Sequence, residues 1–165
     1  MRCMELQVFI ALALGCLLNS TALQGQTRDW SLNGLEVEKR QAIQVVLEDL
    51  STEAIQIGLK TDSLKATCQL RLGHSGILIT SDEKAGVPYL YVAVIVRDLA
   101  FSVEISFRRT VKFEVRGETL YSTAAMWDAG ADGVHGKNPD NVVGAVDLKV
   151  DEFLKEFLKA NPNYR

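Results

Sequence analysis

One stretch of the sequence constrains the fold more than any other, because it alternates apolar and polar side chains from residue 101 to residue 115. The odd positions are apolar except for Arg109, and every even position is polar. A period of two predicts a β-strand with one packed and one solvated face. Such a strand spans roughly 50 Å at about 3.3 Å per residue, so we expect a bulge near Arg108-Arg109.

Further apolar runs on both sides of this stretch predict the remaining strands. Residues 120–127 follow a Gly117-Glu118 turn and predict an antiparallel hairpin with the long strand. Residues 42–50 alternate and predict a mostly one-sided strand, and residues 77–79 predict a short one. Residues 89–96 are apolar on both faces, which is typical of a central strand covered on both sides.

Two segments carry the periodicity of amphipathic helices. The first begins at Thr61-Asp62-Ser63, which offers N-cap oxygens, and its apolar stripe consists of Leu64, Cys68 and Leu72. On this stripe we expect Cys68 to be a small core residue. The second begins at Pro139-Asp140-Asn141 and ends at Asn161-Pro162. Its stripe comprises Val142, Val146, Val150, Phe153, Leu154, Phe157 and Leu158.

The order of these elements predicts the fold class. The order β-α-β-β-β-β-α, with a half-solvated sheet region, predicts an α+β two-layer sandwich. We expect a mixed sheet of about five strands and two amphipathic helices, in a single domain over residues 41–162. Residues 26–40 are polar and irregular, and we expect them to form an N-terminal tether.

The N-terminal region predicts export from the cell. Residues 6–18 form an apolar run behind a short segment that carries Arg2. A membrane span needs about 20 apolar residues, so this run fits a signal peptide better. We expect residues 1–25 to be the signal peptide, with cleavage after Ala22 or after Gly25. The mature chain is then expected to have no transmembrane span and to be periplasmic or extracellular.

A second interpretation of the same region is a lipoprotein signal. Ala13-Leu14-Gly15-Cys16 is a loose lipobox, in which Cys16 would be acylated and become the first residue. Ala13 and the apolar residues after the cysteine fit that pattern less well. We favour a soluble secreted product and keep lipidation at Cys16 as the alternative.

The charge of the chain argues against one class of partner. The formal net charge is −3, and removal of residues 1–25 takes away one basic residue, Arg2, and one acidic residue, Glu5, so it stays at −3. A mildly acidic domain has no general attraction for nucleic acid. We therefore expect no nucleic-acid partner.

Residues 128–138 contain the candidates for chemistry. They are rich in glycine, and we expect them to form a mobile, exposed loop between a strand and the last helix. Asp128, Asp132 and His135 are the candidate metal-ligating or catalytic residues. An EF-hand loop starting at Asp128 would lack the oxygen ligands of positions 3 and 12. No serine lies in a nucleophile elbow. The sequence therefore predicts neither a metal site nor a cofactor.

The chain resembles a family of uncharacterised exported bacterial proteins. The resemblance rests on Pro88 to Val96, the long alternating strand, Ser122 to Trp127, Val150 to Pro162, and the segment from Gly58-Leu59 through the first helix to Gly76-Ile77. It implies no activity and no catalytic residue. The element order is also similar to periplasmic modules such as the N-terminal domain of the Tol-system translocation protein and the curli-secretion lipoprotein, which is an analogy of fold alone.

Two functional hypotheses follow from these observations. The first is a non-enzymatic binding or assembly module of the bacterial cell envelope, whose partner is an envelope protein or another extracytoplasmic molecule. The second is a small metal-dependent enzyme or hydrolase that uses the 128–138 loop. The spatial arrangement of Asp128, Asp132 and His135 distinguishes them, because an enzyme needs the three side chains to converge.

Overall fold

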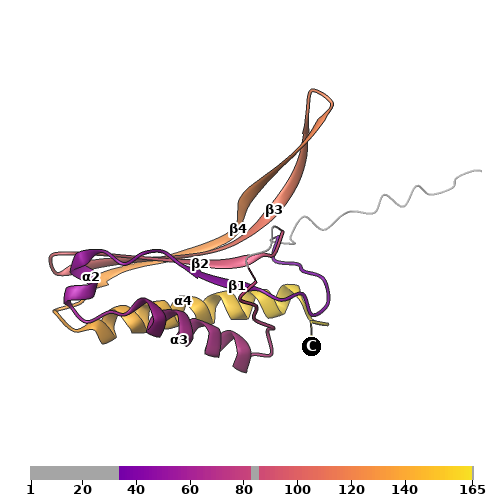
Figure 1. Cartoon of the computed structure of the whole chain (residues 1–165). Coiled ribbons are helices and arrows are strands. Elements are labelled where there is room, and N and C mark those ends of the chain that lie inside the picture. The colour runs from indigo at the N-terminus through magenta and orange to yellow at the C-terminus, as the bar shows by residue number, and fades with distance from the viewer. Residues whose placement is uncertain (1–33, 83–85, 165) are drawn as a thin grey trace, which may run out of the picture. The chain divides into compact units, whose positions relative to one another are not determined.

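A computed structural model describes residues 34–82 and 86–164, which form a sheet with helices packed on one of its faces (Figure 1). The described elements follow in the order β1, α2, α3, β2, β3, β4 and α4. This confirms the predicted α+β class. No helix within the described ranges has both the length and the apolar character needed to cross a membrane.

The sheet has four strands in the order β1-β2-β3-β4. They are β1 (Gln44–Leu47), β2 (Tyr89–Arg97), β3 (Ala100–Val115) and β4 (Glu118–Val134). β1 pairs with β2 in parallel, which requires the intervening chain to cross over the sheet. β2 with β3 and β3 with β4 are antiparallel neighbours joined by tight turns.

Two long helices cover one face of the sheet. They are α3 (Thr61–His74) and α4 (Pro139–Ala160), and both lie on the same side in Figure 1. α4 begins where expected, because Asn138 accepts a hydrogen bond from the Asp140 N–H and Pro139 occupies the first turn. A short helix, α2 (Thr52–Gln56), is capped by the Ser51 hydroxyl and contacts β2.

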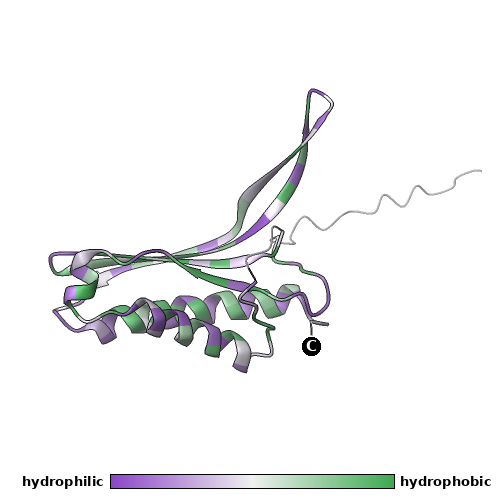
Figure 2. Ribbon diagram, in the orientation of Figure 1, coloured by the Kyte–Doolittle hydropathy of each residue, from purple (hydrophilic) through white to green (hydrophobic). Residues whose placement is uncertain are grey.

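The core lies between the helices and the inner face of the sheet, where apolar segments of the two layers oppose each other (Figure 2). Phe107, Phe153 and Phe157 are all fully buried. Their ring centroids are 5.4 to 6.1 Å apart, in tilted and edge-on arrangements that aromatic pairs favour. Trp127 and Tyr164 extend this cluster at 5.4 and 5.3 Å. The predicted stripe of α4 therefore packs on its own sheet.

The structure corrects the predicted sheet at three points. β4 continues to Val134, so residues 128–134 belong to a strand and the predicted loop was wrong there. The run at 77–79 contributes only an isolated bridge, Ile43↔Ile79, which leaves four strands instead of about five. The tight turn falls at Arg116-Gly117, one residue before the predicted position. Glycine in the 128–134 segment suggested a loop, but its pairing with β3 outweighs that weak local preference.

Other details of the prediction fare differently. The irregularity expected near Arg108-Arg109 is confirmed, because the β3–β4 register shifts between Phe107 and Arg108. β2 was expected to be covered on both sides, yet the side chain of Ile95 is 52% exposed on the face away from the helices. α2 was not predicted, because its few residues are too short a segment for a periodic pattern.

Cys68 lies on the buried stripe of α3 with Leu64 and Leu72, as predicted. Burial is the main cause that raises the pKa of its thiol from 9.0 to about 12, and the nearby Asp147 adds to it. An unfolded chain ionises this thiol from about pH 9, whereas the folded chain keeps the proton. The contribution of this site to the free energy of unfolding is therefore present below pH 9 and lost as the pH rises towards 12.

We expect Cys68 to resist thiol reagents in the folded chain at pH 8, because thiolate is the reactive form and the side chain is inaccessible. The measurement is labelling with iodoacetamide, followed by peptide mapping to identify the modified cysteine. Ala66→Cys provides the matched control, since residue 66 is exposed on the same helix. Labelling of Cys68 in native buffer as fast as that of the control would contradict the packing of α3.

Candidate binding surface

The outer halves of β3 and β4 form a hairpin that extends beyond the helix layer (Figure 1). We call residues 109–125 the arm. Its strands are paired from Arg109↔Ala124 to Val115↔Glu118. The register shift at Phe107/Arg108 marks its base, and such irregularities bend a strand and increase its twist. The arm is therefore a continuation of the sheet in a new direction.

The tip of the arm is a tight two-residue turn. Arg116 and Gly117 both have positive φ angles, of 52° and 81°. This combination is typical of a type I′ turn, whose twist matches that of two antiparallel strands. Gly117 meets the requirement without strain, whereas Arg116 is an unfavourable residue for the left-handed region. The turn fixes which residues of the two strands lie opposite each other.

One face of the arm is apolar along β3, while β4 contributes Leu120 together with Ser122 and Glu118 to the same face. Val111, Phe113 and Val115 continue the side of β3 that is buried at Phe107, but no described helix covers them there. Phe113 and Val115 are 42% and 44% exposed, and Leu120, opposite Phe113, is 41% exposed. Neighbouring exposed apolar side chains of this kind are typical of an interaction surface.

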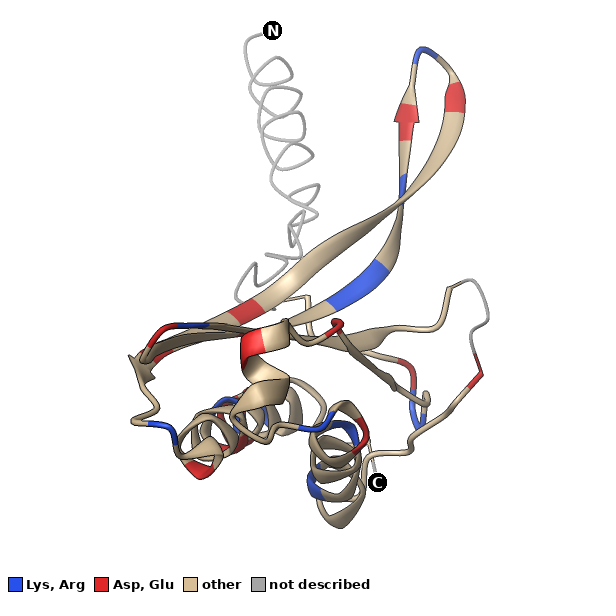
Figure 3. Ribbon diagram, turned by 60° about the vertical axis from the view of Figure 1, so that its left-hand side comes forward, with Lys and Arg blue, Asp and Glu red and all other residues tan. Residues whose placement is uncertain are grey.

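The opposite face of the arm is polar with one aromatic residue. Thr110, Lys112 and Glu114 alternate with the apolar residues, and Tyr121, opposite Lys112, is 70% exposed. Residues of both charges occur along the arm in Figure 3. The mixture of signs, together with the free strand edges, allows a partner strand to be selected by charge.

The base of the arm is held to the domain by Arg109 and by residues 34–37. The Arg109 guanidinium donates a 2.7 Å hydrogen bond to the Glu36 carbonyl, which explains why this position breaks the apolar alternation. Gly34 packs against the side chain of Met126 and has a φ of 71°. A Cβ atom at this glycine would displace the flexible end of the Met126 side chain, and the left-handed φ is the stronger reason for glycine at this position.

A polar cluster around Arg108 lies on the outer face of the sheet next to the arm. The Arg108 guanidinium carbon lies 4.0 Å from the centre of the Tyr91 ring, and its Nε donates to the Ser106 hydroxyl at 2.9 Å. A hydrogen bond to Glu48 is the main cause that raises the pKa of Tyr91. These contacts restrain Arg108, the last β3 residue that is paired with β2.

The structure does not bring Asp128, Asp132 and His135 together. Asp128 and Asp132 lie on β4 opposite Ser106 and Ser102, with exposed side chains on the face away from the helices. His135 is fully buried. The described residues contain no group of three His, Cys, Asp or Glu side chains that could hold a metal ion. Cys16, the candidate lipidation site, lies outside the described residues.

His135 has a structural role. Its Nδ1 accepts a hydrogen bond from the Lys137 N–H at 3.0 Å, so the proton is assigned to Nε2, which donates to the Asp98 carbonyl at 2.8 Å. Asp98 lies in the turn between β2 and β3 and has a positive φ of 51°. The imidazole thus links this turn to the segment that leads into α4, and both nitrogens are occupied.

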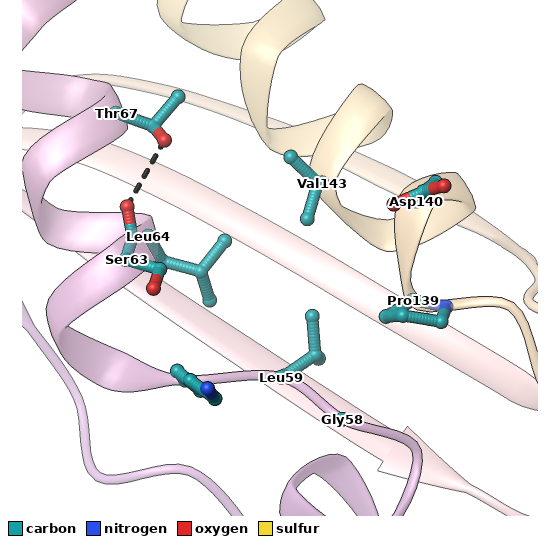
Figure 4. A pocket seen from close by; sticks show the side chains of 9 residues that line it. Gly58, Leu59, Ser63, Leu64, Thr67, Pro139, Asp140 and Val143 are labelled. Atoms are coloured by element: carbon teal, nitrogen blue, oxygen red, sulfur yellow. Dashed lines mark hydrogen bonds between the residues drawn. The ribbon is translucent and has the colours of Figure 1, made fainter.

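The pocket between the N-terminal ends of α3 and α4 contains no catalytic arrangement. It has a volume of about 180 Å³ and is lined mainly by apolar groups such as Leu59, Leu64 and Val143 (Figure 4). The Thr67 hydroxyl within it donates to the Ser63 carbonyl of its own helix. Neither a histidine nor a cysteine lines it. The exposed apolar side chains of the arm make it the candidate functional surface.

Sequence reasoning placed its candidate residues at 128–138, whereas the exposed apolar side chains Phe113, Val115 and Leu120 lie at the other end of the hairpin. It identified the alternating residues of the arm as a strand, but expected their apolar side to be packed. The length of the alternating strand was the signal that could have revealed its exposed end, because the strand exceeds the usual range of 3 to 10 residues. A helix of ordinary length cannot cover all of it, so one end must extend into solvent or contact a partner.

Comparison with known proteins gives similarity to solved structures alone. No protein-family model and no curated protein matches the chain. A crystal structure of a minor lipoprotein from Acinetobacter baumannii is 16% identical, with a TM-score of 0.32, and the match covers 72% of this chain and 90% of that chain. Rare lipoprotein B from Shewanella oneidensis is 13% identical, with a TM-score of 0.26, covering 72% and 93%. At these values neither match assigns a family or an activity to the chain.

Proposed function

We propose that the protein is a non-enzymatic binding or assembly module of the bacterial cell envelope, and that it engages its partner through the arm. The observation that carries this proposal is the exposure of Phe113, Val115 and Leu120 on a hairpin that extends beyond the helix layer. A strand with free backbone N–H and C=O groups binds another strand by β-augmentation, and the neighbouring apolar side chains add area and selectivity.

The location in this proposal rests on the N-terminal sequence. The apolar run at residues 6–18 fits a signal peptide, and the loose lipobox at Cys16 provides an alternative route to the envelope. Either route delivers the domain outside the cytoplasm. The partner is then an extracytoplasmic protein strand, possessing an apolar face that matches the one on the arm.

Site-directed photocrosslinking in intact cells tests this function. A photoreactive amino acid at Thr119, on the arm, is expected to give a discrete adduct in the envelope fraction. The same amino acid at Lys155, which is exposed on α4, is the matched control and should give none. Replacing Phe113 and Leu120 by serine in the Thr119 variant should abolish the adduct without unfolding the domain, since both side chains lie outside the core.

Two results would contradict the proposal. One is the absence of any adduct at Thr119 and at the neighbouring arm positions. The other is an equal yield of adducts at Thr119 and Lys155, which would show that contact is not restricted to the arm. Circular dichroism of each variant verifies that the fold is retained.

A further inference from the structure

The arm has a strand edge that no described strand occupies. Pairing between β2 and β3 ends at Tyr89↔Arg108. From Arg109 to Val115, β3 is paired only with β4, as far as the described ranges extend. Its backbone N–H and C=O groups on the other side are therefore a template for a further strand.

The residues along this edge are complementary to the same residues read in the opposite direction. They read Val111-Lys112-Phe113-Glu114-Val115. Reversing the order about Phe113 places valine opposite valine and lysine opposite glutamate. An antiparallel pair of identical strands repeats this relation on both sides of its two-fold axis. Charge and shape therefore both match in this register.

We propose that the free edge of β3 in the arm pairs antiparallel with the same edge of a second copy of this chain, with the two-fold axis at Phe113. This inference rests on the proposed function and names the partner. Lys112 then lies opposite Glu114 of the second copy, and the reciprocal pair forms on the other side of the axis. Val111 lies opposite Val115 of the second copy, and the two Phe113 side chains are neighbours.

This register also joins the apolar faces of the two arms. Residues directly opposite in an antiparallel pair lie on the same face, so Val111, Phe113 and Val115 of both copies form one continuous surface. The polar face carries the two Lys112–Glu114 pairs. The resulting sheet has four strands in the order β4-β3-β3-β4, and the two-fold symmetry prevents growth into a filament.

Neighbouring registers are less favourable. With the axis at Lys112, the two lysines lie opposite each other, and like charges in that position destabilise a strand pair. With the axis at Val111, Glu114 lies opposite Arg108 of the second copy. The edge of β3 at Arg108 is already paired with Tyr89 of β2. An axis between two residues places the apolar face of one arm beside the polar face of the other. Phe113 is therefore the favoured centre.

The outer edge of β4 is a poorer candidate for the same contact. Its charged residues are Glu118, Asp128 and Asp132, with no lysine or arginine from Glu118 to Val134. Pairing of two β4 edges in any register gives no oppositely charged pair. The observations thus favour the β3 edge.

Charge reversal tests the proposal with the purified full chain, measured by sedimentation equilibrium. We expect the original chain to dimerise reversibly. Lys112→Glu and Glu114→Lys alone should each raise the dimer dissociation constant by about tenfold or more, because each places like charges opposite each other twice. The double variant Lys112→Glu/Glu114→Lys should restore dimerisation. A mixture of the two single variants should form heterodimers, although neither associates alone.

A disulfide trap tests the position of the axis. Phe113→Cys should form a covalent dimer under mild oxidation, because Cα atoms directly opposite in an antiparallel pair are about 4.5 to 5.5 Å apart, within disulfide range. Thr119→Cys, on β4, is the control and should not. The chain without an introduced cysteine contains the same native cysteines and provides the background.

The outcomes separate this inference from the proposed function. A chain that stays monomeric, or a dimer that none of the charge variants weakens, overturns the pairing of β3 edges. If Thr119 still gives an adduct with a different protein in that case, the arm remains a binding surface and only the identity of the partner is wrong. If both assays are negative, both proposals fail.

Discussion

Phe153→Ala is expected to lower the free energy of unfolding by about 3–5 kcal/mol, the usual cost of truncating a buried phenylalanine. Phe153 is fully buried, and its ring centroid lies 5.6 Å from that of Phe107 and 5.4 Å from those of Trp127 and Phe157. The substitution leaves a cavity where helix and sheet meet and removes three aromatic contacts. Since domains are stable by only about 5–15 kcal/mol, this loss is a large fraction of the total. Chemical denaturation by urea, followed by tryptophan fluorescence, measures it.

The matched control for this prediction is Leu148→Ala on the same helix. Leu148 is 63% exposed, so its truncation should change the free energy of unfolding by less than about 0.5 kcal/mol. Equal effects of the two substitutions would show that α4 does not dock on the sheet through the Phe153 face.

Asn161→Ala is expected to destabilise the domain by about 2–4 kcal/mol, because it removes three hydrogen bonds and leaves backbone groups unpaired. The Asn161 amide nitrogen donates to the carbonyls of Leu35 and Phe157, each at 2.9 Å, and its oxygen accepts from the Val37 N–H at 2.9 Å. The side chain thereby joins the end of α4 to residues 35–37. Thermal unfolding followed by circular dichroism provides the measurement.

Asn163→Ala is the control for Asn161, because residue 163 has the same side chain but is exposed. Its substitution should leave the melting temperature almost unchanged. Hydrogen exchange adds a local test, since the Val37 amide should lose protection in Asn161→Ala alone. Retention of that protection would contradict the assigned contact.

Local sequence patterns were sufficient to predict the two long helices, α3 and α4, and the hairpin of β3 and β4. The spacing of Leu64, Cys68 and Leu72 specifies the buried face of α3. Pro139 specifies the start of α4. The pairing of residues 128–134 was missed, because Gly130 and Gly133 disfavour a strand when considered alone. Pairing with β3 stabilises β4 there. A Cβ atom at Gly130 would crowd the Val103 carbonyl, and one at Gly133 would not fit beside the Phe101 ring.

The candidate site was harder to predict for a different physical reason. An alternating strand specifies that one face is apolar, but the pattern is identical whether a helix or a partner covers that face. Phe107 is buried and Phe113 is exposed, and only the position at which the helix layer ends in the folded structure distinguishes them. His135 shows the same limit, because its two hydrogen bonds are to backbone groups of Asp98 and Lys137 that the sequence does not identify.

The parallel pairing of β1 with β2 implies an order of folding. β2, β3 and β4 are consecutive and joined by tight turns, so their contacts close short loops at small entropic cost. β1 can pair with Tyr89 and its neighbours only after the chain has crossed through α2 and α3. Contacts between residues distant in sequence form slowly. We therefore expect the meander of β2, β3 and β4, and with it the arm, to form early and β1 to complete the sheet last.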